Sequence, residues 1–110
     1  MNFNEAWKRI VRYAKSQKYV ETLVKNVRNE ICYVNSSLIV VESSSPRRTQ
    51  TKRELKREHF EFVWKILEST GSVSSTDIDP HLRGRRLIIL ALMAQALNLR
   101  YDTEPVRIYL

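Results

Sequence analysis

The chain has 110 residues, of which 43% are hydrophobic and 28% are charged. This balance is typical of a globular protein with a packed core, and it excludes a chain that is disordered throughout. Lys and Arg number 19 against 12 Asp and Glu, so the net charge is +7, and this excess favours an anionic partner. A single cysteine, Cys32, excludes an internal disulfide framework.

The first residues do not form a secretory signal pattern, because Lys8, Arg9 and Arg12 interrupt the apolar positions. The longest uninterrupted apolar run covers residues 87–94, whereas a membrane-spanning helix needs about 20 residues. We therefore expect a cytoplasmic protein with no membrane partner.

Apolar residues in the first fifteen positions recur at the spacing of one helix face. They are Phe3, Trp7, Ile10, Val11 and Ala14. Asn2 or Asn4 can cap this predicted helix. Residues 20–27 fit either a second helix or a strand followed by a loop. Residues 30–42 are rich in β-branched and aromatic side chains around a turn at residues 35–37, which predicts a β-hairpin.

A Ser-Ser-Ser-Pro cluster at residues 43–46 ends the predicted hairpin. Residues 46–58 hold six cations and two anions, and residues 46–52 are interpreted as a basic connector. We expect an N-terminal helical and β-hairpin part at residues 1–45 and a C-terminal module at residues 53–110, packed together as one compact unit.

The C-terminal module is predicted to begin with a helix. Thr51 and Glu54 have the spacing of a capping box, which predicts a helix start near Lys52, with Arg57 as the alternative. Gly71 is expected to end this helix, because glycine tolerates the left-handed conformation beyond a helix end.

Four further elements are predicted after Gly71. A short strand is expected around Val73, and a short helix starts at residue 75 or 76. A very apolar helix then covers residues 85–97, and residues 99–110 alternate as a closing hairpin. The fold class is therefore α+β, with an N-terminal helix or helices and a β-hairpin followed by this module.

By the order of these elements, residues 53–110 resemble the winged helix-turn-helix class. In that class the helix after the turn enters the DNA major groove with its N-terminal residues. The resemblance implies that residues 72–82 form the turn, that residues 83–86 face the groove, and that residues 102–104 form the tip of the wing.

Basic residues in the connector, at the start of the apolar helix and in the hairpin are the candidate nucleic-acid-binding residues. They are Arg47, Arg48, Lys52, Arg53, Arg83, Arg85, Arg86, Arg100 and Arg107. Arginine can pair with phosphates or contact guanine bidentately. An alternative interpretation is that the connector is ordinary solvated surface and that the helix beyond Leu87 is a buried core helix.

No residue pattern indicates catalysis. His59 and His81 have no nucleophile context. Asp77, Asp79 and His81 alternate as metal ligands can, but capping explains Asp77 better. Glycine-rich phosphate loops are excluded, since the chain has only two glycines. We therefore expect no enzymatic activity, no cofactor, no metal and no small-molecule substrate.

The function predicted from these observations is that of a nucleic-acid-binding regulator or accessory protein, with double-stranded DNA favoured. A second expected partner is another copy of this chain. In that homodimer one face of the apolar helix would be buried at the interface. The alternative function is a protein-interaction or assembly module of a larger complex, which would use the helix at residues 85–97 and a hairpin edge.

Overall fold

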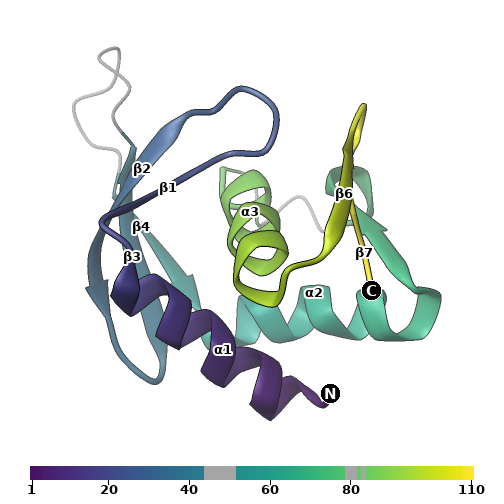
Figure 1. The fold of residues 1–110 in the computed structure, drawn as a ribbon, viewed down its shortest axis with the longest axis horizontal. Coiled ribbons are helices and arrows are strands. Elements are labelled where there is room, and N and C mark those ends of the chain that lie inside the picture. The colour runs from purple at the N-terminus through teal and green to yellow at the C-terminus, as the bar shows by residue number, and fades with distance from the viewer. Residues whose placement is uncertain (44–51, 79–81, 83) are drawn as a thin grey trace.

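The computed structural model describes residues 1–43, 52–78, 82 and 84–110. These residues form an α+β fold, as the sequence predicts, with helices beside two antiparallel sheets (Figure 1). In chain order the elements are α1 (Phe3–Ser16), β1 (Tyr19–Glu21), β2 (Arg28–Val34), β3 (Leu38–Ser43), β4 (Lys52–Lys56), α2 (Arg57–Thr70), β5 (Ser72–Ser74), the short 3-10 helix η1 (Ser75–Asp77), α3 (Arg86–Leu97), β6 (Arg100–Thr103) and β7 (Val106–Tyr109).

The predicted N-terminal helix and hairpin are both confirmed. Asn2 caps α1, because its side-chain oxygen accepts a hydrogen bond from the backbone N–H of Glu5 at 2.9 Å. At the hairpin turn, the Asn35 side chain accepts from the N–H groups of Ser37 and Leu38. The Trp7 ring N–H donates to the Ser36 carbonyl at 2.8 Å, which ties α1 to this turn.

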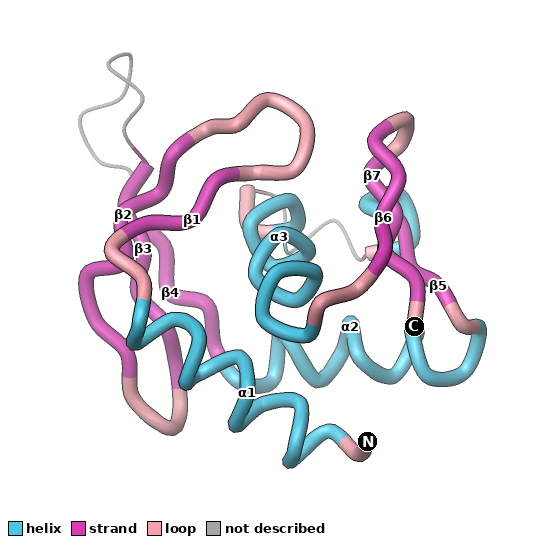
Figure 2. Tube along the Cα trace, viewed as in Figure 1, coloured by secondary structure: helices cyan, strands magenta, loops and turns pink. Residues whose placement is uncertain are grey.

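The first sheet has four antiparallel strands in the order β1-β2-β3-β4. For residues 20–27 the structure resolves the two predicted alternatives in favour of a strand and a loop, since β1 ends at Glu21 and a turn follows. The loop that joins β1 and β2 arches from this sheet toward α3 (Figure 2).

The predicted helix start near Lys52 is wrong, and the alternative start at Arg57 is confirmed. Residues 52–56 form β4 because β3 offers a pairing edge and Leu55 alternates into the core, where it is fully buried. The N–H of Lys56 donates to Nδ1 of His59 at 3.1 Å, so the helix cap lies five residues later than the predicted capping box. Residues 53–56, assigned above to the C-terminal module, thus complete the N-terminal sheet.

The second sheet has three antiparallel strands in the order β5-β7-β6. Gly71 ends α2 in the left-handed conformation, with φ +82°, as the sequence predicts. The next three residues form β5, which pairs with the last strand, β7. Alternation along β7 buries Val106 and Ile108, and the hairpin β6–β7 closes the fold.

Helix α3 lies at the centre of the molecule, between the two sheets (Figure 1). It contacts α1, β1, β7 and η1. Its fully buried side chains are Ile89, Leu90, Ala91, Leu92 and Met93. A helical segment that is buried on all sides must be apolar all round, so residues 88–94 form a core segment, whereas Gln95 is exposed. The apolar side chains of residues 88–94 are therefore packed inside this chain, whereas Leu87 is 41% exposed.

Candidate nucleic-acid interface

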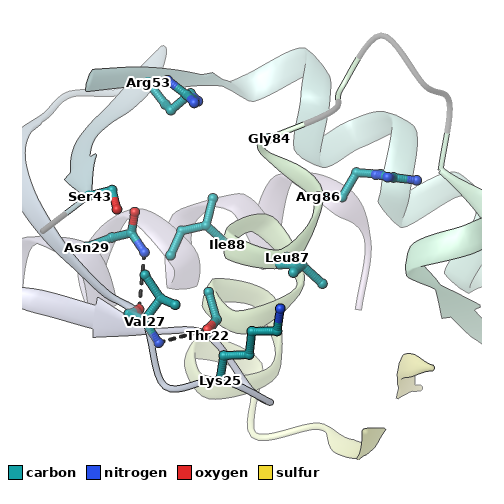
Figure 3. A pocket seen from close by; sticks show the side chains of 10 residues that line it. All are labelled: Thr22, Lys25, Val27, Asn29, Ser43, Arg53, Gly84, Arg86, Leu87 and Ile88. Atoms are coloured by element: carbon teal, nitrogen blue, oxygen red, sulfur yellow. Dashed lines mark hydrogen bonds between the residues drawn. The ribbon is translucent and has the colours of Figure 1, made fainter. Parts of the chain in front are cut away.

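The inner face of the four-stranded sheet ends at a cleft of about 530 Å³ that faces the start of α3 (Figure 3). Strand alternation decides which sheet residues line it. Arg53 lies two residues before buried Leu55, and Ser43 lies two residues after buried Val41, so both point to the inner face. Asn29 is the cross-strand partner of Ser43 and lines the same wall.

The opposite wall comes from the turn before α3 and from its first residues, Gly84, Arg86, Leu87 and Ile88. Gly84 has φ +86°, a conformation that favours glycine, and a Cβ atom there would lie 3.3 Å from Nε of Arg53. The Arg53 side chain therefore packs closely against this turn. Residue 83 itself lies outside the described residues.

The third wall is the loop between β1 and β2, which contributes Thr22, Lys25 and Val27. The loop is closed by its own hydrogen bonds: the N–H of Val27 donates to Oγ1 of Thr22 at 3.0 Å, and Nδ2 of Asn29 donates to the Val27 carbonyl at 3.2 Å (Figure 3). Thr22 and Asn29 are both buried. These bonds hold the loop in a defined conformation beside the cleft.

Three cations from three separate elements line this cleft, which we call the cationic cleft. Lys25 comes from the β1–β2 loop, Arg53 from β4 and Arg86 from α3. Among the described residues that line it, none is acidic. The positive potentials of these side chains add within the cleft, because none of its described lining residues is a carboxylate.

Two backbone contacts join the start of α3 to its surroundings. Nε of Arg85 donates to the Glu54 carbonyl of β4 at 3.1 Å, and Nη1 of Arg86 donates to the Ser75 carbonyl at 3.0 Å. Arg86 extends toward η1, so its guanidinium lies at the rim of the cleft rather than at its centre (Figure 3). The structure thus brings Arg53, Arg85 and Arg86 together.

The hairpin arginines lie apart from the cationic cleft and contact polar side chains of the second sheet. Nη1 of Arg107 donates to Oγ of Ser72 at 3.0 Å and lies 3.9 Å from a carboxylate oxygen of Asp77. The guanidinium of Arg100 stacks 5.2 Å from the centre of the Tyr109 ring. The hydroxyl of Tyr109 donates to Asp102.

Asp77 acts as a cap, as the sequence predicts. Its carboxylate accepts a hydrogen bond from the backbone N–H of Ser74 at 3.0 Å. This bond, with a smaller contribution from the positive charge of Arg107, lowers the pKa of Asp77. Asp79 and His81, the other members of the metal pattern considered above, lie outside the described residues.

The other predicted site residues are placed differently. Lys52 is exposed on the outer face of β4, opposite Glu42 of β3, and does not line the cationic cleft. Arg47, Arg48 and Arg83 lie outside the described residues.

The prediction from sequence missed Lys25. It belongs to residues 20–27, whose secondary structure the sequence left open between two alternatives, and it is a single cation between Val24 and Asn26. A signal was present in Asn26, which adopts the left-handed conformation at φ 51° and is a residue type favoured in turns.

Comparison of the chain with protein families, with characterised proteins and with solved structures found no match. Across residues 1–43, 52–78, 82 and 84–110, the structure has no helix of the length and apolarity that crossing a membrane requires.

Proposed function

We propose that this protein binds nucleic acid, with double-stranded DNA favoured, and acts as a regulator or accessory factor without catalytic activity. The observation that carries the proposal is a cleft lined by Lys25, Arg53 and Arg86 whose described lining contains no acid. A polyanion gains from such a surface by releasing its condensed counterions when the protein neutralises its phosphates.

The proposal includes a winged-helix-like arrangement of residues 53–110, and the order of the elements within residues 57–109 supports it. A helix, a strand, a short helix, a second helix and a closing hairpin follow one another, and β7 lies between β5 and β6. Because residues 88–94 of α3 are buried, contact of DNA with the start of this helix would be made by Arg85, Arg86 and Leu87. The wider interface would then include the β1–β2 loop, which a winged-helix module alone does not supply.

A cytoplasmic location and a homodimer belong to the same proposal. Since the apolar side chains of α3 are packed inside one chain, a homodimer would have to form through other surfaces. A solution-mass measurement over a range of protein concentrations tests the oligomeric state.

The proposal is tested by reversing one charge in the cleft. Lys25 is exposed and has no hydrogen bond or ion pair within the part of the chain that the structure describes, so Lys25→Glu changes the potential without removing a structural contact. Fluorescence anisotropy with a labelled random-sequence duplex at about 50 mM salt should show affinity falling about tenfold.

Lys65→Glu is the matched control, because Lys65 is an exposed lysine on α2 and does not line the cationic cleft. It makes the same change in net charge and should lower affinity less than twofold. Equal losses in the two variants would mean that only net charge matters, and no binding by the unaltered protein to duplex DNA, single-stranded DNA or RNA would reject the proposed function.

A further inference from the structure

A second cleft adjoins the cationic cleft across the β1–β2 loop. Its volume is about 390 Å³, and its lining includes Tyr13, Tyr19 and Tyr101. Thr22 lines both clefts, while Lys25 lines the cationic cleft and Asn26 lines the second one. One short loop therefore separates a cationic cleft from a cleft that is rich in tyrosine, and we call the latter the tyrosine cleft.

Two of the tyrosines in this cleft expose much of their surface. Tyr19 is 40% exposed and Tyr101 is 46% exposed. The Arg28 guanidinium stacks on the Tyr19 ring, 3.9 Å from its centre. Within the described residues Tyr101 has no side-chain hydrogen bond. Tyr101, whose ring has no such contact within the described residues, is therefore available to a ligand that brings its own flat apolar face.

The polar groups of the tyrosine cleft are held in place. The hydroxyl of Tyr13 donates to Oε1 of Gln95 at 2.7 Å, and Nε2 of Gln95 donates to the Glu21 carbonyl at 3.3 Å. Burial raises the pKa of Tyr13 further above neutral pH, so its hydroxyl keeps the proton that it donates to Gln95. Glu21 is acidic and also lines the cleft. Its charge repels a phosphate but does not repel a neutral base.

We propose that the tyrosine cleft binds an unpaired nucleobase whose adjacent phosphates lie in the cationic cleft. The inference rests on the proposed function and narrows its ligand to nucleic acid with unpaired nucleotides at a duplex end or an interruption. In a continuous duplex the base faces are stacked on one another and only base edges are exposed, so a ring can be offered to Tyr19 or Tyr101 only where pairing is broken. Stacking on aromatic side chains accepts any base.

Tyr101→Ala tests this inference. Three labelled probes of one sequence are compared by fluorescence anisotropy: a blunt duplex, the same duplex with an unpaired overhang, and the single strand. The variant should lose about tenfold in affinity for the overhang and for the single strand and less than twofold for the blunt duplex. Tyr101→Phe, which keeps the ring, should retain the affinity of the unaltered protein.

Tyr33→Ala is the matched control, because Tyr33 is 56% exposed on β2 and lines neither cleft. It should leave binding of all three probes unchanged. A 2-aminopurine base in the overhang reports stacking directly, since its fluorescence should fall on binding to the unaltered protein and not on binding to Tyr101→Ala.

The two proposals fail in different ways. If Lys25→Glu weakens binding but Tyr101→Ala weakens the three probes equally or not at all, the inference is overturned and the proposed function stands. If no probe binds the unaltered protein, both are rejected. Self-association that Tyr101→Ala abolishes while single-strand binding persists would assign the tyrosine cleft to a second copy of the chain and overturn the inference.

Discussion

The cationic cleft and the β6–β7 hairpin both contain arginines that the sequence marks as candidates for nucleic-acid binding, yet their surroundings differ. The cationic cleft is lined by Arg53, Lys25 and Arg86, and none of its described lining residues is acidic. In the hairpin, Arg107 lies beside Asp77. Arg100 stacks on the ring of Tyr109, whose hydroxyl donates a hydrogen bond to Asp102. The comparison teaches that the carboxylates around an arginine decide whether its charge is available to a ligand.

The geometry of the strands causes this difference. Arg107 of β7 has two cross-strand partners: Asp102 on β6 and Ser74 on β5. Side chains directly opposite one another share a face, so the hairpin arginines point toward polar groups of the same sheet. On β4, by contrast, Arg53 shares a face with Leu55 and emerges at the end of the core. There the half-buried Arg53 lines a cleft whose described residues include no carboxylate, so its charge remains available to a ligand.

The largest expected effect comes from charge reversal at one arginine of each region. Arg53→Glu should lower affinity for a random duplex about tenfold at low salt, because it places a negative charge among the cations of the cleft. Arg100→Glu should lower affinity less than twofold. Both are measured by anisotropy, with thermal melting to confirm that each variant is folded, and similar losses in the two variants would break the comparison.

A smaller effect is expected on stability at Arg107. Arg107→Ala removes a hydrogen bond to Ser72 and the attraction between the guanidinium and the carboxylate of Asp77, so the free energy of unfolding should fall by about 1 kcal/mol. DNA affinity should be unchanged. Denaturant unfolding measures the first quantity, and a normal unfolding curve accompanied by weakened DNA binding would assign Arg107 to the interface instead.

The smallest effect concerns the pH dependence of stability. Because the pKa of Asp77 is lowered in the folded state, its charge stabilises the fold above the ordinary aspartate pKa of about 3.9, and this stabilisation is lost as the pH falls through the folded value. Asp77→Asn keeps an acceptor for the Ser74 N–H and loses the charge, so it should cost a few tenths of a kcal/mol at pH 7.

In acid, once the pH has fallen below the lowered pKa of Asp77, that difference between Asp77→Asn and the unaltered protein should shrink toward zero, because both side chains are then neutral. Denaturant unfolding at the two pH values checks the sign. A cost that is larger in acid than at neutral pH would mean that the charge of Asp77 does not stabilise the folded state.

Periodicity in the sequence was sufficient for most elements. The apolar spacing of α1, the turn at residues 35–37, the stop at Gly71 and the alternation in residues 99–110 each predict an element that the structure contains. These signals are local, because each depends on side chains within one helix face or one strand. The capping-box spacing at Thr51 misled because a tertiary partner, strand β3, determines the conformation of residues 52–56.

Fewer residues of the candidate site than elements of the fold could be predicted from the sequence. Arg53 and Arg86 could be predicted from the clusters of basic residues around them. Lys25 and the three tyrosines could not, because they are isolated in sequence and only the path of the β1–β2 loop brings them to the start and flank of α3. A site assembled from loops of separate elements leaves no spacing for a sequence pattern to reveal.

The most direct test of the account is the salt dependence of DNA binding by the unaltered protein and by Lys25→Glu/Arg53→Glu. If both side chains contact phosphates, a plot of log affinity against log salt should be shallower by about two units of slope in the double variant, since each phosphate contact contributes about 0.9. Parallel plots for the two proteins would contradict the claim that the cationic cleft holds the backbone of a nucleic acid.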